Sequence, residues 1–231
     1  MDVDAFVFDI GGTVFDWSTA LAEALDRWGV SSTGAAAAFA LCCRAAFLDR
    51  IGRVVKGDEP WATSDEVLRA AVRQASAETG LILDAGKIER VALAWRDMPA
   101  WPGAREAVAA LRRRAQVAPL TILSWPMAAG SSRRNGIVWD GLLCCDVIGV
   151  YKPDPRSYTR AAEIMRVDPA RIAMVASHHS NLRAARSAGW KTVFVRPHIE
   201  DPGEDYADPG LAVEFDVAVA DFAELGERLG N

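Results

Sequence analysis

A carboxylate ends an apolar run near the N-terminus, where a buried strand would normally pass into turn residues. The apolar residues 5–8 are followed by Asp9, and Gly11 and Gly12 then turn the chain. A charge at such a position costs desolvation energy unless a partner stabilises it. Asp9 is therefore either a turn or cap residue, which is the commoner use of aspartate, or a reactive group held at the edge of a sheet.

Other polar side chains follow three further apolar runs, LTILS, VIGVY and IAMVA: Ser124, Lys152, and the group Ser177, His178 and Asn181. If these runs are parallel strands, their carboxyl ends meet at one edge of the sheet. An aspartate there can act as a covalent nucleophile, and a nearby ammonium keeps it ionised by lowering its pKa. Each residue alone also has an ordinary structural explanation, such as a hydroxyl bonded to backbone or a solvated lysine.

The elements that would position these groups alternate along the chain. Apolar runs predict buried parallel strands, and the patterns between them return at helical spacing. This order predicts a doubly wound, Rossmann-like α/β parallel sheet with right-handed crossovers. The predicted strands are AFVF, LTILS, VIGV, IAMVA and TVFVR; the predicted helices lie at 105–114, 156–166 and 181–190; and 216–229 repeats the strand-then-helix order.

One region breaks the alternation, because residues 16–98 contain no convincing strand. We expect a core domain formed by residues 1–14 and 99–231, with a helical cap domain inserted at 15–98. A cap in this place would cover the carboxyl edge of the sheet and exclude water from it. Its helices are expected at 18–29, 36–52, 64–80 and 85–98.

Composition restricts the partners and the compartment. The 231 residues are 51% hydrophobic and 25% charged with a net charge of −5, which is typical of a globular protein and does not favour nucleic acid or an anionic membrane as partner. The four cysteines form two adjacent pairs without the spacing of a zinc site. With no signal segment and no apolar run long enough to span a bilayer, we expect a cytoplasmic protein with buried thiols.

Four stretches resemble the motifs of the haloacid dehalogenase superfamily, and most closely its L-2-haloacid dehalogenase (type II) branch: FDIGGTVFDW, TILSW, GVYKPDPRSY and MVASHHSNLRAARSAGWKTVFVRP. The stretch FALCCRAAFLDRIGRVVKGDEPW resembles that branch's cap helix more loosely. The resemblance implies that Asp9 displaces halide from a small 2-halocarboxylate and that water hydrolyses the resulting aspartyl ester to a 2-hydroxy acid. It implies no cofactor. Because relatives are often homodimers, it also allows a homodimer.

The same resemblance assigns roles within the predicted core. Thr13 would orient Asp9, and Lys152 would anchor it electrostatically. Ser124, with neighbouring backbone N–H groups, would hold the substrate carboxylate, and Tyr158 would lie near the site.

Two cap residues complete the implied substrate site. Arg44 would meet the departing halide, and Trp17 would form a wall of the pocket. Both also have a plain alternative, since amphipathic helices carry surface charges and tryptophan commonly packs in a core.

Three positions depart from the dehalogenases that the motifs resemble. Gly11 stands where they usually carry Tyr or Phe, Trp125 where they carry Asn, and Asn181 where they carry an Asp that helps activate water. One hypothesis is that the Trp125 indole fills the space left at Gly11. Asn181 cannot accept a proton as a carboxylate can, so His178 or His179 is the candidate base, unless both only bond backbone.

The departures also bear on competing functions. Phosphatases of the superfamily carry a second Asp at the position of Gly11 and metal-binding carboxylates near Ser177 and Asn181, so the sequence predicts no metal site. Two alternatives to dehalogenation stay open. One is hydrolysis of a different bond next to a carboxylate, such as opening of a strained C–N ring. The other is a catalytically impaired relative that binds a small carboxylate.

Overall fold

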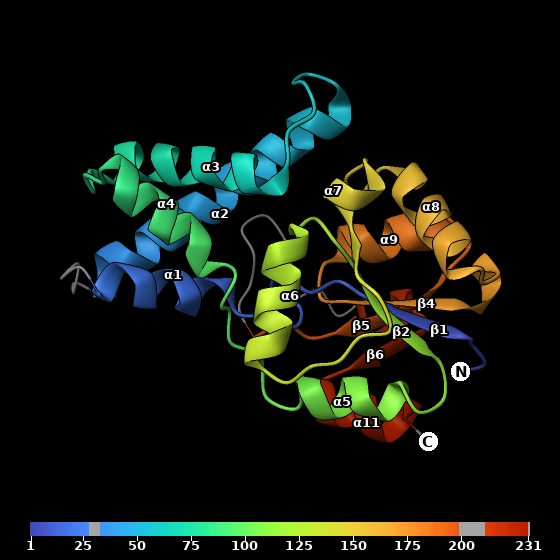
Figure 1. The fold of residues 1–231 in the computed structure, drawn as a ribbon. Coiled ribbons are helices and arrows are strands. Elements are labelled where there is room, and N and C mark those ends of the chain that lie inside the picture. The colour runs from blue at the N-terminus through green and yellow to red at the C-terminus, as the bar shows by residue number, and fades with distance from the viewer. Residues whose placement is uncertain (28–32, 199–210, 231) are drawn as a thin grey trace.

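The computed structural model describes residues 1–27, 33–198 and 211–230, and its centre is a parallel sheet (Figure 1). Six strands lie in the order β3-β2-β1-β4-β5-β6, and all five neighbouring pairs are parallel. The predicted doubly wound α/β fold is thereby confirmed. The strands are β1 Ala5–Phe8, β2 Gln116–Thr121, β3 Leu143–Cys144, β4 Ile172–Ala176, β5 Lys191–Val195 and β6 Val217–Val219.

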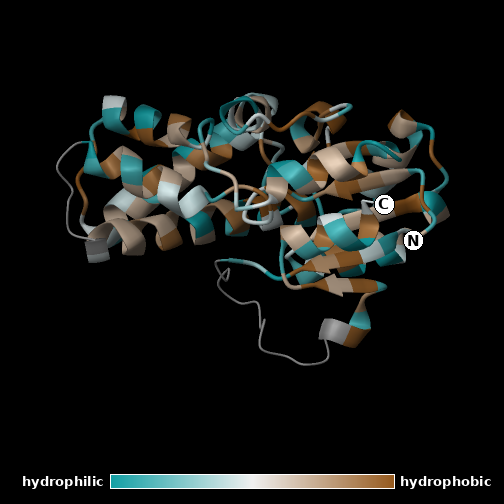
Figure 2. Cartoon of the chain, turned by 90° about the horizontal axis from the view of Figure 1, so that it is seen from below, coloured by the Kyte–Doolittle hydropathy of each residue, from teal (hydrophilic) through white to brown (hydrophobic). Residues whose placement is uncertain are grey.

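Helices cover both faces of this sheet (Figure 1). Helices α5 (Ala104–Leu111) and α11 (Phe222–Leu229) pack together on one face, and α8 (Pro155–Met165) and α9 (His179–Ser187) lie on the other. Strands β1 and β4 are buried at every residue, because helices cover the sheet on both faces. Such strands must be apolar along their whole length. Figure 2 shows mostly hydrophobic strands and helices of mixed hydropathy. Two short helical segments, η1 Pro169–Arg171 and α10 Leu211–Glu214, complete this part.

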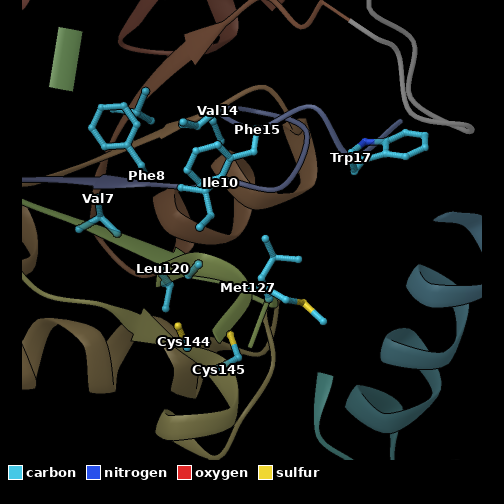
Figure 3. Close-up of a cluster of buried hydrophobic side chains, with 14 of the residues drawn as sticks. Val7, Phe8, Ile10, Val14, Phe15, Trp17, Leu120, Met127, Cys144 and Cys145 are labelled. Atoms are coloured by element: carbon cyan, nitrogen blue, oxygen red, sulfur yellow. The ribbon is translucent and has the colours of Figure 1, made fainter. Parts of the chain in front are cut away.

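The hydrophobic core surrounds β1, where Phe8, Ile10 and Phe15 are fully buried (Figure 3). Figure 3 also places Cys144 and Cys145 beside Leu120, in the part of the core formed by β2 and β3. Both thiols are buried, and burial raises the pKa of each to about 12. All four cysteines are free. Cys43, Cys144 and Cys145 are buried and act as small apolar core groups, whereas Cys42 is half-buried and its thiol donates to Glu78 at 2.9 Å.

Two strand predictions were wrong in their positions. Strand β2 occupies Gln116–Thr121 rather than LTILS, because the strand already begins before Pro119, where the apolar run looked interrupted. The run VIGV is not a strand at all, since Cys145–Ile148 forms the short helix α7. Val147 is exposed, and Gly149 ends the helix in a left-handed conformation (φ 81°), neither of which fits a buried strand.

The segment between β1 and α5 forms four helices that pack against one another beside the sheet (Figure 1). This arrangement is consistent with the expected helical cap. The capping box of Thr63 and Glu66 begins the third helix, and Gly80 ends it in a left-handed conformation. The helices are α1 Trp17–Asp26, α2 Thr33–Lys56, α3 Ser64–Thr79 and α4 Ala85–Ala94. None of the helices within the described ranges is long and apolar enough to cross a membrane.

The chain leaves and re-enters the sheet region through two segments that lie side by side. Phe15 and Ala100 form an antiparallel bridge, the Asp16 N–H donates to the Pro99 carbonyl at 2.8 Å, and the Trp101 N–H donates to the Val14 carbonyl at 2.9 Å. This crossing lies where we expect the domain boundaries. The division into 1–14 with 99–231 and 15–98 stays a prediction.

Helix α6 (Trp125–Arg134) presses closely on the returning segment, and this contact generates a stability prediction. A Cβ atom on Gly130 would overlap the carbonyl oxygen of Arg96. We expect Gly130→Ala to lower the free energy of unfolding by about 1–3 kcal/mol, because an overpacked backbone must shift. Gly52→Ala on α2 is the matched control: its Cβ meets nothing within 4 Å, so better helix propensity should raise stability by up to about 1 kcal/mol. Urea unfolding measures both, and equal effects would contradict the prediction.

Candidate active site

The carboxylate that ends the first strand lies at the topological switch point of the sheet. The Asp9 N–H donates to the Val175 carbonyl at 2.9 Å, which continues the β1–β4 pairing one residue beyond β1. The strand order reverses between β1 and β4, and open α/β sheets bind ligands in the crevice at this point. The fold therefore presents Asp9 where a ligand would bind.

Two donors hold the Asp9 carboxylate, one at each oxygen. Lys152 Nζ donates to Oδ1 at 2.8 Å, and both side chains of this ion pair are buried, at 1% and 4% exposure. Thr13 Oγ1 donates to Oδ2 at 2.7 Å and accepts from the Ser177 N–H at 3.0 Å. The orientation of the carboxylate is thus fixed from three separate parts of the chain.

The balance of burial and charge keeps Asp9 ionised. Burial on its own would raise the pKa of the Asp9 carboxyl, but the adjacent Lys152 ammonium and the hydrogen bonds to the carboxylate outweigh it, so the pKa is lowered. An ionised carboxylate stripped of water and held at both oxygens can act as a nucleophile.

The two histidines that were candidate bases lie in different surroundings. His178 Nε2 is 3.4 Å from Asp9 Oδ2 and 3.1 Å from the Gly11 carbonyl oxygen. The neighbouring His179 is buried instead among aromatic rings, with its centroid 5.4 Å from Phe194 and 6.2 Å from Phe215. Only His178 therefore borders the carboxylate.

A cavity of about 190 Å³ opens beside Asp9. Six predicted site residues line it, namely Asp9, Gly11, Arg44, Lys152, His178 and Asn181. The remaining lining residues were missed by sequence reasoning and are mostly apolar: Leu48, Ile51, Gly52, Ile122, Pro153 and Ser180. The cavity thus joins one carboxylate and two cationic side chains to an apolar wall.

Helix α2 supplies one wall of the cavity. Arg44, Leu48, Ile51 and Gly52 share one helix face, so their spacing could have identified them. Arg44 Nη2 donates to the Gly11 carbonyl at 3.3 Å, and its guanidinium lies over the Trp17 ring at 5.4 Å. Trp17 does not line the cavity; instead, its ring packs against the Arg44 guanidinium.

Ser124 and Trp125 lie at the start of α6 and do not line the cavity. Ser124 Oγ accepts from the Met127 N–H at 3.4 Å and donates to Asp65 Oδ1 at 3.2 Å. Trp125 is 52% exposed.

The space beside Gly11 belongs to Leu123, whose side-chain carbons come within 3.6 Å of the position of a Cβ. The hypothesis that the Trp125 indole fills this space is therefore wrong, because the indole lies on the first turn of α6 and is half exposed.

Tyr158 and Ser177 lie behind the cavity wall. The Tyr158 hydroxyl donates to the Asn181 carbonyl at 3.3 Å and so holds the first turn of α9, while its ring packs against Trp190. Ser177 Oγ is buried, and none of the described residues bonds to it. A buried hydroxyl without a partner is costly, so we expect a water or a substrate atom to satisfy it.

The residues present do not fit a magnesium ion. Among the residues that the structure describes, Asp9 is the sole carboxylate lining the cavity, and both its oxygens are bonded to other side chains. The neighbouring positions hold Gly11, Ser177 and Asn181, whereas a hard divalent cation prefers several charged oxygens. Across the part of the chain that the structure describes, no three His, Cys, Asp or Glu side chains converge on a common point that could hold a metal.

Comparison with known proteins agrees with this geometry. The family model of the haloacid dehalogenase-like hydrolases matches residues 3–189. The chain belongs to this family. It is 28% identical over 211 residues to the (S)-2-haloacid dehalogenase 4A of Burkholderia cepacia, covering 88% of this chain and 87% of that relative.

Solved structures of L-2-haloacid dehalogenases superpose over almost the full length of this hydrolase. One, 28% identical, gives a TM-score of 0.87 and covers 98% of both chains. Another, described as a defluorinating L-2-haloacid dehalogenase, is 26% identical with a TM-score of 0.85, covering 99% of this chain and 96% of that one.

The buried ion pair of this hydrolase generates a stability prediction. Lys152→Met would leave Asp9 buried without its cation, so we expect the free energy of unfolding to fall by roughly 3–5 kcal/mol. Adding Asp9→Asn removes the stranded charge, and the double variant should recover a large part of this loss. Urea unfolding of the wild type, both single variants and the double variant measures the coupling. If the losses of stability in the two single variants simply add up in the double variant, the predicted coupling is wrong.

The lowered pKa of Asp9 also predicts how stability depends on pH. In the folded state the carboxyl stays ionised to lower pH, so its contribution is fully present above the unfolded pKa of about 3.9 and is lost as the pH falls through the folded pKa. The stability of wild type relative to Asp9→Asn should thus fall as the pH drops below about 4. Unfolding titrations at each pH test this, and a relative stability that stays constant or rises in that acidic range would refute it.

Proposed function

We propose that this hydrolase removes halide from small L-2-haloacids and gives 2-hydroxy acids through an ester on Asp9. The observation that carries the proposal is the buried, ionised Asp9 carboxylate, held by Lys152 at 2.8 Å and facing a cavity that also contains the Arg44 guanidinium. The names of the similar proteins, which include 2-haloacid dehalogenases, support the same reaction.

The first step is a displacement at carbon. An Asp9 oxygen forms a bond to C2 of the substrate while the carbon–halogen bond breaks and its electron pair leaves with the halide. Attack opposite the leaving group inverts C2, so an L substrate gives a D product. Lys152 and Thr13 hold the carboxylate in place, which removes the cost of orienting it during the reaction.

The reaction involves two anionic groups, the departing halide and the substrate carboxylate, and each needs a partner in the site. The guanidinium of Arg44 can stabilise the departing halide, since a fixed cation acts strongly where water is excluded. Ser124, with backbone N–H groups, stays our candidate for the substrate carboxylate. Because its hydroxyl is bonded to Asp65 across to α3, it can do so only by releasing Asp65.

The second step is hydrolysis of the ester, in which water attacks the Asp9 carbonyl carbon. Asn181 lines the cavity, but an amide accepts no proton from that water. The reaction therefore needs another acceptor nearby.

A second candidate reaction is the opening of a strained C–N ring next to a carboxylate. It would use the same nucleophile, and His178, 3.4 Å from Asp9, favours it because an imidazolium can protonate the leaving nitrogen. A third possibility is that the protein is a catalytically impaired relative that binds small carboxylates. It would then bind the substrate without turnover.

Halide release tests the proposal directly. Incubated with L-2-chloropropionate in the absence of added metal, the wild type should release chloride and form D-lactate. Asp9→Asn should release none, because an amide is a very poor nucleophile. Ion chromatography and chiral analysis measure the two products.

The remaining outcomes separate the candidates. Chloride release that survives in Asp9→Asn would refute the nucleophile. No release from several haloacids, together with opening of a small cyclic imino acid, would favour the ring-opening reaction.

A further inference from the structure

The glycine turn after β1 leaves room for an imidazole. Gly12 has φ +89°, and a Cβ built on it would lie 3.3 Å from both Cε1 and Nε2 of His178 and 3.4 Å from Trp17 Nε1. The two distances to the imidazole are tighter than ordinary van der Waals contact. The histidine ring thus occupies the space that a side chain at position 12 would need.

The backbone of the same turn holds the ring beside the reacting group. His178 Nε2 lies 3.1 Å from the Gly11 carbonyl oxygen and 3.4 Å from Asp9 Oδ2. Arg44 Nη2 lies 3.4 Å from the same nitrogen and can donate to its lone pair in the neutral imidazole, whereas the Gly11 carbonyl can accept from this nitrogen once it is protonated. The imidazole lines the cavity with a side chain only 12% exposed, so it can reach a water that approaches Asp9.

We propose that His178 is the catalytic base that activates the hydrolytic water in the second step. This assignment rests on the proposed function and deepens it. Histidine exchanges protons near neutral pH, whereas the Asn181 amide on the same wall does not. Among the histidines within the described ranges, only His178 lines this cavity.

The proposed step conserves atoms and charge. The water oxygen bonds to Cγ of esterified Asp9, and one water proton passes to His178 Nε2. The tetrahedral intermediate then breaks the bond between Cγ and the ester oxygen, whose electron pair leaves with the product. The imidazolium returns its proton to that oxygen, which gives the 2-hydroxy acid. Asp9, now carrying one oxygen from water, loses its remaining proton to solvent and is ready for the next turnover.

The test separates alkylation from hydrolysis in the His178→Asn variant. With L-2-chloropropionate, we expect a burst of one chloride per active site followed by turnover reduced at least 100-fold, the lower end of a typical general-base contribution. Intact-protein mass spectrometry should show a lasting increase of one propionate unit, located on Asp9 by peptide mapping. Turnover at the wild-type rate, or a lost burst in a folded variant, would overturn the assignment.

Two further variants exclude a merely structural role. Asn181→Asp added to His178→Asn restores a proton acceptor on the same cavity wall, so the rate of ester hydrolysis should recover at least tenfold. If it does not recover, the defect of His178→Asn is not the loss of a base. His179→Asn changes the adjacent histidine, which packs against Phe194 and Phe215, and should not accumulate ester.

The outcomes also distinguish this assignment from the proposed function. If the wild type releases no halide, the proposed function fails and His178 loses its role with it. If the wild type turns over and His178→Asn hydrolyses its ester equally fast, only the assignment of the base fails.

Discussion

The arrangement of this hydrolase depends on one buried ion pair, Lys152 with Asp9. Two charges taken out of water are expensive, and the expense is offset only where the geometry is good and the remaining lone pairs are bonded. The structure meets both conditions, because Nζ lies 2.8 Å from one oxygen while Thr13 donates to the other. Short helix α7 and the left-handed Gly149 deliver the lysine from a segment far along the chain. The pair thus joins β1 to the segment after α7.

The glycine turn that follows Asp9 contacts both the four-helix region and the segment that returns from that region to the sheet. The Gly12 carbonyl accepts from Trp101 Nε1 at 3.0 Å, and the Gly11 carbonyl accepts from Arg44 Nη2 at 3.3 Å. Trp101 belongs to the segment returning from the four-helix region, and Arg44 to that region itself. A displacement of α2 would therefore be felt at the turn that follows the nucleophile. This coupling links the helical region to the turn that follows Asp9.

The sequence predicted best those features that follow from local pattern and from the rule for parallel strands. Asp9 and His178 follow apolar runs in neighbouring strands, so their convergence could be foreseen. The surroundings of Ser124 could not, because its bond to Asp65 joins residues distant in the chain. The direction of Trp125 failed for a similar reason: the orientation of a helix start depends on packing. The VIGV run failed because a short apolar stretch fits a strand or a buried helix equally well.

The departures of this chain from the dehalogenases that its motifs resemble are best understood together. An amide at Asn181 removes a proton acceptor from one wall of the cavity. An imidazole at 178 can replace it only if the facing turn has space, and the ring lies where a side chain on Gly12 would be. Once the imidazole Nε2 has taken the proton, it can donate to the Gly11 carbonyl 3.1 Å away, which stabilises the imidazolium. Considered on its own, the absence of a carboxylate at position 181 would suggest an inactive protein. Considered with the glycine turn and the histidine, it supports our proposal that the acceptor is His178, three residues earlier after the same strand.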